Sequence, residues 1–400
     1  MRVRVPTLDD VHVDGKRVLV RVDFNVPLQE GGVVGDDTRI RATLPTLREL
    51  LDAGATLVLA SHLGRPKGPD DEARLAPVAE RLADLLERPV RYTPTSGPGA
   101  SEQQAFVAAG ESGSITLLEN TRFDARETKN DPELAKVLAG YADLFVNDAF
   151  GAAHRAHAST EGVARLLPSY AGRLLERELT ALGALLDDPE RPFVVVLGGA
   201  KVSDKIGVIR NLLGVADTIL IGGAMAFTFA KAAGGRVGDS LVEDDKLDLA
   251  RDLVTEAEER GVRLLVPDDV VCAPRVERGI EIAVHAIDDI PDGQKGLDVG
   301  PDTIRRFERI VLAARTVLWN GPMGVFEIPP FDVGTRAIAH AVAESGASSV
   351  IGGGDSVAAV NAIGVADRIG HVSTGGGASL EFLEGRTLPG VAALGSVGGA

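Results

Sequence analysis

The sequence contains one cysteine, no long apolar run and no recognisable export signal. Cys272 has no second cysteine to pair with, which excludes an internal disulfide and favours a reducing compartment. It also lacks an obvious partner set for nucleophilic or metal chemistry, so we expect a small buried residue there. No segment approaches the roughly 20 apolar residues of a membrane-spanning helix, and the N-terminal residues lack the apolar core of a signal peptide. These absences predict a cytoplasmic protein.

Basic residues are also in short supply. The chain has 42 lysines and arginines against 58 aspartates and glutamates, a net charge of −16. Nucleic acids and membrane surfaces are polyanionic, so this charge argues against both as partners. Two nucleotide signatures are missing as well, because there is no Gly-x-x-x-x-Gly-Lys-Ser/Thr and no Gly-x-Gly-x-x-Gly after a strand pattern. Neither a P-loop hydrolase nor an ordinary dinucleotide dehydrogenase is therefore indicated.

Short apolar runs and helical patterns, in contrast, alternate along the whole chain. With 400 residues, 44% of them hydrophobic, the chain is too long for a single core, and two domains are expected. The predicted strands are 18–22, 56–60, 114–118, 144–146, 193–197, 218–221, 262–266, 316–319 and 349–351. The predicted helices include 40–51, 75–86, 174–186, 249–260 and 304–314.

This alternation predicts an α/β fold of two Rossmann-like domains with parallel sheets, joined by a hinge helix, in a bilobal molecule with a central cleft. We expect the first domain over 1–168 and the second over 188–388. The hinge helix is expected over 169–187, where leucines recur at helical spacing until Asp187-Asp188-Pro189 ends the pattern.

In open parallel sheets, ligands bind beyond the carboxyl ends of the strands. In the first half of the chain, the residues at these positions are rich in arginine and histidine: Arg39, His62, Arg65, Arg122 and Arg155. A single arginine would be a solvated ion-pair partner, but this set in an acidic protein indicates a shared anionic ligand, because guanidinium groups bind carboxylate and phosphate bidentately. A zinc site is not favoured, since no histidine belongs to a compact ligand motif.

In the second half of the chain, the same positions are rich in glycine. The segments are 198–201, 222–225, 320–324, 352–356 and 373–379. Glycines allow an adenine ring to pack flat and backbone amides to approach phosphate oxygens. One such segment would be a tight turn, but five at one sheet edge indicate a nucleotide site. Asp355 could hold Mg²⁺ bound to phosphates, or it could be a first-turn aspartate of a helix.

The segment 193–205 leaves two interpretations open. If a helix starts near Ala200, Lys201 and Lys205 lie on one face of its first turns, where the helix dipole disfavours cations by roughly 0.3–1 kcal/mol. A bound polyanion such as a nucleotide phosphate would compensate. A glycine-capped turn before a solvated helix, with the lysines paired to Asp204 and other acids, explains this segment alone equally well.

Taken together, the motifs resemble those of the phosphoglycerate kinase family over essentially the full chain. They are Arg-Val-Asp-Phe-Asn-Val-Pro (21–27), Ser-His-Leu-Gly-Arg-Pro (61–66), Val-Asn-Asp-Ala-Phe-Gly (146–151) with His-Arg-Ala-His (154–157), Leu-Gly-Gly-Ala-Lys-Val-Ser-Asp-Lys (197–205), Trp-Asn-Gly-Pro-Met-Gly-Val-Phe-Glu (319–327), Ile-Gly-Gly-Gly-Asp-Ser (351–356) and Ser-Thr-Gly-Gly-Gly-Ala (373–378). The resemblance implies reversible, Mg²⁺-dependent phosphoryl transfer from 1,3-bisphosphoglycerate to ADP, giving ATP and 3-phosphoglycerate, as in glycolysis and gluconeogenesis. It also implies that residues 389–400 return to the first domain. We expect a monomer.

The resemblance further implies the roles of individual residues. Those that would hold phosphoglycerate are Asp23, Phe24, Asn25, Arg39, His62, Leu63, Gly64, Arg65, Arg122 and Arg155. Those that would bind the nucleotide are Gly198, Lys201, Lys205, Gly222, Asn320, Pro322, Val325, Glu327, Gly353, Gly354, Asp355 and Ser356, with Asp355 also serving the metal. The groups that would stabilise the transferring phosphoryl are Arg39, Lys201 and the amides around Gly353, Gly354, Gly376 and Gly377. Ser356 stands where threonine is expected and Met323 where valine is expected, which keeps a hydroxyl and an apolar wall.

This chemistry needs no general base, because the acceptor carboxylate is already ionised near neutral pH. Positioning and charge neutralisation remain, in a direct transfer without a covalent enzyme intermediate. Because the two sets of site residues lie on different domains, transfer is expected to need closure about a hinge near 166–186.

Three other functions are less favoured. A kinase of another small acid would need a different basic set. A non-catalytic two-lobed binding protein has no use for Lys201 together with Asp355. A dehydrogenase would need the missing dinucleotide fingerprint.

Overall fold

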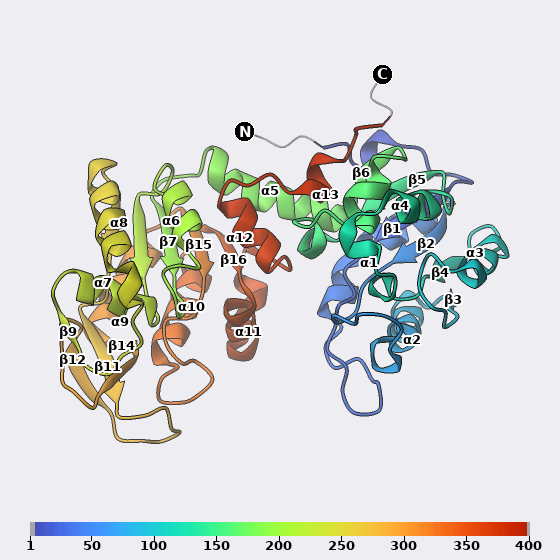
Figure 1. Ribbon diagram of the computed structural model, residues 1–400. Helices are drawn as coiled ribbons and strands as arrows, with labels where there is room; N and C mark the ends of the chain where they lie inside the picture. The colour runs from blue at the N-terminus through green and yellow to red at the C-terminus, as the bar shows by residue number, and fades with distance from the viewer. Residues whose placement is uncertain (1–4, 398–400) are drawn as a thin grey trace. The chain divides into compact units, whose positions relative to one another are not determined.

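The computed structural model describes residues 5–397, which divide into two compact units. The first unit comprises residues 5–180 and 387–397, and the second comprises Ala181–Arg386. The predicted first domain and its returning segment therefore include residues 1–4 and 398–400, which lie outside the described residues. Each unit is built on a six-stranded sheet of its own (Figure 1).

The sheet of the first unit is parallel throughout, in the order β3-β4-β2-β1-β5-β6. Its strands are β1 (Arg17–Arg21), β2 (Thr56–Ala60), β3 (Val90–Arg91), β4 (Ile115–Leu117), β5 (Leu144–Asn147) and β6 (Ser169–Ala171). The helices are α1 (Thr38–Asp52), α2 (Ala76–Leu86), α3 (Ser101–Ala108), α4 (Pro132–Ala139) and α13 (Pro389–Ala392), while α5 (Arg173–Asp187) runs across the boundary between the units. In this order, the carboxyl ends of β4, β2, β1 and β5 adjoin at one edge.

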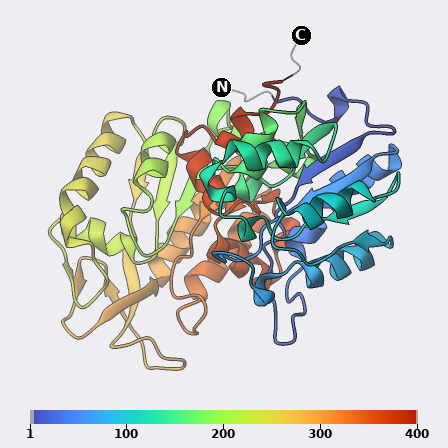
Figure 2. The same ribbon diagram turned by 45° about the vertical axis from the view of Figure 1, so that its right-hand side comes forward.

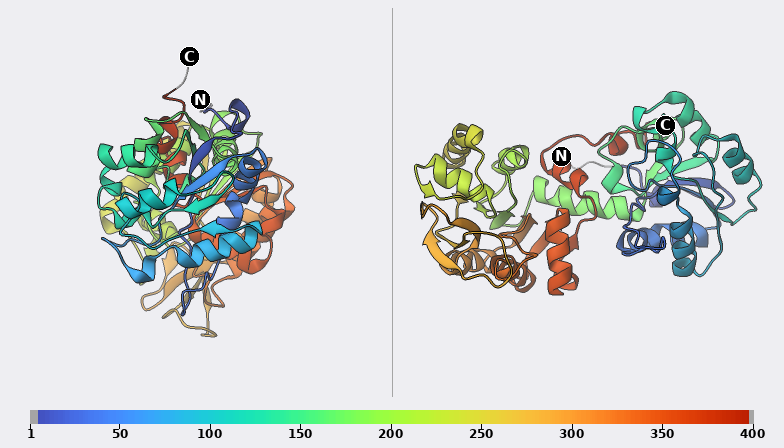
Figure 3. Two further views of the ribbon diagram at one scale, coloured as in Figure 1. Left: turned by 90° about the vertical axis from the view of Figure 1, so that its right-hand side faces the viewer. Right: turned by 60° about the horizontal axis from the view of Figure 1, so that its bottom comes forward.

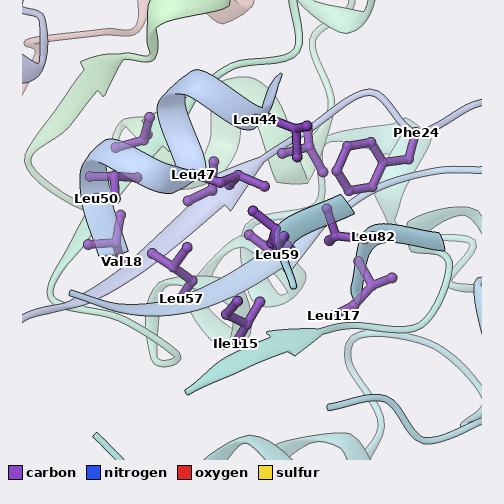
Figure 4. Packing of buried hydrophobic residues seen from close by; sticks show 14 of the residues in the cluster. Val18, Phe24, Leu44, Leu47, Leu50, Leu57, Leu59, Leu82, Ile115 and Leu117 are labelled. Atoms are coloured by element: carbon purple, nitrogen blue, oxygen red, sulfur yellow. The ribbon is translucent and has the colours of Figure 1, made fainter. Parts of the chain in front are cut away.

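Apolar periodicity explains the main core of the first unit. In α1, Leu44, Leu47 and Leu50 recur at helical spacing and point onto the sheet (Figure 4). They meet strand residues such as Val18 and Leu57, which are fully buried. Burying each such side chain contributes about 1.5–3 kcal/mol relative to exposure. Helices cover both faces of this sheet (Figure 3), so its central strands are apolar on both sides and carry their polar residues at their ends.

The main sheet of the second unit is also parallel, in the order β10-β8-β7-β15-β16-β17. Its strands are β7 (Phe193–Leu197), β8 (Thr218–Ile221), β10 (Arg263–Leu265), β15 (Thr316–Asn320), β16 (Ser348–Gly352) and β17 (His371–Val372). The helices are α6 (Ile206–Leu212), α7 (Met225–Ala232), α8 (Leu247–Glu259), α9 (Pro301–Leu312), α10 (Val333–Glu344), α11 (Gly354–Ile363) and α12 (Gly377–Leu383). One face packs against α9, α10 and α11 through a cluster that includes Phe307, Ile338 and Val360.

The second unit also contains two small sheets that were not predicted, and one of them is antiparallel. An antiparallel sheet joins β12 (Ala283–Ala286), β11 (Asp269–Ala273) and β14 (Lys295–Val299), and a parallel pair joins β9 (Arg236–Val237) with β13 (Asp289–Ile290). Figure 2 shows the antiparallel strands at the lower left of the molecule. Apart from β11, these strands are short or only partly buried, so they lack the continuous apolar run that marks a parallel strand.

The α/β prediction of two parallel-sheet domains is confirmed. The predicted strands, and the predicted helices other than the one near Ala200, coincide with observed elements to within about three residues. The hinge helix expected over 169–187 begins at Arg173, because residues 169–171 form the strand β6. Cys272 is buried, as predicted. Within residues 5–397, no helix is both long and apolar enough to cross a bilayer.

Candidate active site

The arginine-rich edge of the first unit is formed by loops that follow adjacent strands. Asp23 follows β1. It accepts a hydrogen bond at 3.1 Å from Nη1 of Arg39, which lies at the start of α1. The Asn25 side-chain oxygen accepts from the amide of Gly64, beyond β2, at 2.8 Å. Arg122, beyond β4, donates to the carbonyl of Gly64 at 3.0 Å. The sheet therefore brings residues from three strand ends into one hydrogen-bonded set.

His62 is a neutral member of this set. Burial lowers its pKa to about 3, and the charges of Arg21, Arg122 and Arg155 add to this effect while Asp23 opposes it. Arg21 Nη2 lies 3.1 Å from His62 Nδ1, and because arginine can only donate, Nδ1 accepts and the ring proton is on Nε2. We expected His62 to add to a basic cluster. It offers a neutral hydrogen-bond donor instead.

The positive charges of this edge repel one another. Burial lowers the pKa of Arg122, and Arg155, Arg21 and Arg65 lower it further. For Asp23, burial would raise the pKa, but neighbouring charges that include Arg39 and Arg21 reverse the effect and keep it below its usual value. A cluster of cations with one ionised carboxylate carries excess positive charge, and a bound anion would relieve it.

A buried network behind this edge was not predicted. Arg21 Nε donates to Ser159 Oγ at 2.8 Å, and Ser159 Oγ donates to Glu127 Oε1 at 2.5 Å. All three side chains are almost fully buried, and Glu127 supplies the countercharge for Arg21. The one signal in the sequence is the placement of Arg21 at the end of a buried strand, where an unpaired arginine would be costly.

The other residues predicted to bind phosphoglycerate differ in their exposure. Phe24 and Leu63 are buried in the core cluster, and their amides already donate to Ser61 Oγ at 2.9 Å and to Asn120 Oδ1 at 3.3 Å. Gly64 and Arg65 are exposed. Arg155 is half-buried, and its Nε donates to His154 at 3.0 Å.

At the glycine-rich edge of the second unit, backbone hydrogen bonds connect the loops that follow the strands. The amide of Gly198 donates to the Asn320 carbonyl at 3.0 Å, that of Gly222 to Leu197 at 2.8 Å and that of Gly223 to Met323 at 3.0 Å. A β-carbon added at Gly198 would collide with the carbonyl oxygen of Pro322. Glycine therefore lets the loops after β7, β8 and β15 approach closely.

A cavity of about 680 Å³ opens beside these loops, wholly within the second unit. Its apolar wall includes Phe227, Leu241, Val276, Leu297, Met323 and Val325. Pro322, Glu327 and Asp355 also line it, and Gly198 and Gly222 are next to lining glycines. An apolar wall with a few acidic and backbone groups suits a flat heterocycle attached to a polar, metal-binding tail. The aromatic and aliphatic residues contributed by residues 227–297 were missed, because they lie far from the strand ends.

The predicted helix start near Ala200 is wrong. Residues 198–205 form a turn, and α6 begins at Ile206, so Lys201 and Lys205 do not share a helical face. Two contacts hold this turn: the Lys205 amide donates to the Val202 carbonyl at 2.9 Å, and the Ser203 amide donates to Oε2 of Glu243, a side chain 40 residues away, at 3.0 Å. Lys201 is exposed, whereas Lys205 is buried and donates to Asn320 Oδ1. Burial lowers the pKa of Lys205, and Asp204, Asp355 and Glu384 oppose this shift.

The helices α11 and α12 begin at this edge. Their N-caps, Gly353 and Gly376, have φ of 93° and 52° and make no side-chain cap, so first-turn amides near Gly354 and Gly377 stay available as donors. Ser356 is buried, and its Oγ accepts from the Gly321 amide at 2.5 Å. Its hydroxyl therefore ties two loops together.

Asp355 is a first-turn aspartate of α11, one of the two roles considered for it, and this position leaves it available as a metal ligand as well. Its side chain is exposed in the first turn of α11 and lines the cavity. Among residues 5–397, no three histidine, cysteine, aspartate or glutamate side chains gather as a ready-made metal site. Mg²⁺ is commonly held by one or two carboxylates together with substrate phosphates and water, and a single carboxylate beside a phosphate site suits that mode.

Known proteins resemble this chain over nearly its whole length, in sequence and in structure. Residues 8–386 match the family model for phosphoglycerate kinase. A phosphoglycerate kinase of Thermus thermophilus is 60% identical over 389 residues, 97% of this chain and 99% of the relative. One of Chloroflexus aurantiacus is 59% identical over 392 residues, 97% of this chain and 98% of the relative. The solved structure of phosphoglycerate kinase from Coxiella burnetii has a TM-score of 0.89 at 40% identity and covers 98% of each chain. Likeness of this extent, in sequence and in fold, means that the chain belongs to the phosphoglycerate kinase family.

Proposed function

We propose that this chain transfers a phosphoryl group reversibly between 1,3-bisphosphoglycerate and ADP, giving 3-phosphoglycerate and ATP. The proposal rests on the different residues at the two sheet edges. At the edge of the first unit, arginines surround a neutral histidine. At the edge of the second unit, glycines lie beside a cavity of about 680 Å³. A small phosphorylated acid suits the first edge, and a nucleotide suits the second.

In the first unit, Asp23, Asn25, Arg39, His62 and the arginines at 65, 122 and 155 bind phosphoglycerate. The guanidinium groups pair with its phosphate and carboxylate, and His62 donates from Nε2. The backbones of Phe24, Leu63 and Gly64 complete this site.

In the second unit, the nucleotide base lies against the apolar wall that includes Val325, with Glu327 at the ribose. Gly198, Gly222, Asn320 and Pro322 form the adjoining loops. Asn320 Nδ2 is a buried donor without a partner within the described residues, as a ligand-binding amide would be. Lys205 and the backbones of Gly353, Gly354 and Ser356 contact the phosphates, and Asp355 holds Mg²⁺.

The transfer step breaks the bond between phosphorus and the acyl oxygen of 1,3-bisphosphoglycerate and forms one to a terminal phosphate oxygen of ADP. The leaving group is a carboxylate, so no proton has to move and no base is needed. Arg39, Lys201 and the amides near Gly376 and Gly377 stabilise the charge on the phosphoryl in transit. Bound Mg²⁺ would neutralise phosphate charge.

The two substrates are held by different units, so the units must approach for transfer. We place the hinge in α5 and the segment leading to it, residues 169–187, together with the return of the chain at 389–400. We further propose that the protein works in the cytoplasm and as a monomer. Analytical ultracentrifugation with both substrates tests the oligomeric state.

A coupled assay with 3-phosphoglycerate and Mg·ATP tests the activity. Turnover with 3-phosphoglycerate, and little with other small carboxylic acids, is expected. Chelation of divalent cations should abolish it, and Asp355→Asn should raise the Mg²⁺ concentration needed for half-maximal rate. No turnover by the folded wild type would refute the proposed function, and a rate insensitive to chelation would refute the metal dependence.

A further inference from the structure

Three anchors hold the turn that carries Lys201. Val202 is fully buried, Ser203 is hydrogen-bonded to Glu243, and Lys205 is buried against Asn320. Ser203 uses both of its donors on that one carboxylate: its amide lies 3.0 Å from Oε2 and its Oγ lies 2.6 Å from Oε1. Lys201, on the N-terminal side of these anchors, is exposed. The position of its backbone therefore depends on what holds the anchors.

Glu243 is itself fixed to the body of the second unit. Its amide donates to Oγ1 of Thr228, a buried residue of α7, at 3.2 Å. The segment 239–242 just before it lines the cavity, as do Gly199 and Ala200 just before Lys201. Glu243 thus connects two loops that both border the cavity.

We propose that Glu243 is a positioning residue for phosphoryl transfer: by holding Ser203, it fixes the turn that presents Lys201 to the phosphates. This inference rests on the role proposed above for Lys201. Glu243 contacts no reacting atom, and it acts only through Ser203.

The contact is strong enough for this task. Burial would raise the pKa of Glu243, but hydrogen bonds from the Ser203 hydroxyl and from the Ser203 and Val202 amides outweigh it and lower the pKa. The carboxylate is therefore ionised, and its bonds to Ser203 are charge-assisted. The same contact gives the Ser203 amide an acceptor outside its own segment, so it ties the turn at 200–205 to the loop that carries Glu243. A displacement of about 1 Å in such a group can cost roughly 100-fold in rate.

The test compares Glu243→Ala, Glu243→Gln, Ser203→Ala and the double variant S203A/E243A with wild type. Glutamine can still accept from the Ser203 amide and can donate to its hydroxyl, so it is the conservative variant. Asp244→Asn is the matched control, because Asp244 is adjacent and exposed, and it pairs with Lys231 at 2.7 Å. Steady-state kinetics are measured with each substrate varied in turn, and each variant is checked by thermal unfolding.

We expect Glu243→Ala to lower kcat about 10- to 100-fold and to raise the KM for Mg·ATP, with the KM for 3-phosphoglycerate unchanged within about twofold. Ser203→Ala should change kcat and the KM for Mg·ATP in the same direction but by less, because its backbone amide can still donate to Glu243. The double variant should be no worse than the stronger single variant, because both remove one connection. Glu243→Gln should recover most of the rate, and Asp244→Asn should match wild type.

Wild-type kcat in Glu243→Ala would overturn the inference while leaving the proposed function intact. Additive losses in the double variant, or equal losses in Asp244→Asn, would also overturn it. Absence of turnover in the wild type would instead remove the proposed function on which the inference rests.

Discussion

His62 illustrates how one residue takes its properties from its neighbours. It lies among arginines, which cannot lose their protons, and Arg21 faces its Nδ1. His157 is in a similar position, because burial first and then Arg21, Arg122, Arg155 and His154 lower its pKa to about 4. Both rings are therefore neutral in the folded protein, and each can donate a hydrogen bond without adding charge.

An NMR titration tests whether the rings of His62 and His157 are neutral. An ordinary histidine titrates near pH 6.5. The ring resonances of His62 and His157, assigned with His62→Gln and His157→Gln, should stay constant from pH 8 down to about 5. A midpoint above pH 6 for either ring would contradict the arrangement described for the arginine edge.

The same shift links His62 to stability. Its folded pKa, about 3, lies below the unfolded value near 6.5, so the unfolded chain binds more protons between these limits. The free energy of unfolding therefore includes the full contribution of the neutral His62 ring above pH 6.5, and it loses this contribution as the pH falls toward 3. Denaturant unfolding at pH 7, 5.5 and 4.5 should show His62→Gln losing less stability than wild type, by up to about 1 kcal/mol per pH unit. Equal losses would argue against a buried neutral ring.

At the scale of elements, the strands could be predicted and the turns between them only in part. Strands such as β2 and β7 are buried on both faces, so they carry unbroken apolar runs, and the residues after them are the site residues. The turn at 200–205 was mispredicted as a helix, and local sequence does not reveal the contact between Ser203 and Glu243 that holds it. The part of the cavity wall contributed by residues 227–297 was missed for a similar reason, since Val270 and Leu297 are brought there by the antiparallel sheet.

A pair of glycine substitutions tests the packing of these elements. Gly198→Ala places a β-carbon against the Pro322 carbonyl and should push apart the loops after β7 and β15. We expect a loss of about 1–3 kcal/mol of stability and a raised KM for Mg·ATP. Gly183→Ala, in α5, is the control because its β-carbon meets nothing within 4 Å, and it should gain up to about 1 kcal/mol. Unchanged nucleotide binding in Gly198→Ala would contradict the close approach.

At the scale of the whole molecule, the largest consequence follows from the assignment of the proposed catalytic residues to two different units. Arg39 belongs to the first unit and Lys201 to the second, and the boundary between the units falls within α5. Alternation of strands and helices predicted two domains, but how the units come together during catalysis is a proposal. Its physical reason is that phosphoryl transfer needs both substrates in contact and water excluded.

Solution X-ray scattering tests this proposal. The radius of gyration should change little with 3-phosphoglycerate alone or with Mg·ADP alone, and it should fall when both are present, because only the pair of substrates bridges the two units. Equal compactness in all four states would contradict closure.

The most direct test of the account is the kcat of Arg39→Ala and of Lys201→Ala, measured beside wild type in the coupled assay with 3-phosphoglycerate and Mg·ATP. Each variant removes one cation from one unit, and each should lower kcat by roughly 100- to 1,000-fold while the protein remains folded. Wild-type kcat in either variant would contradict the claim that residues of both units stabilise the same transferring phosphoryl group.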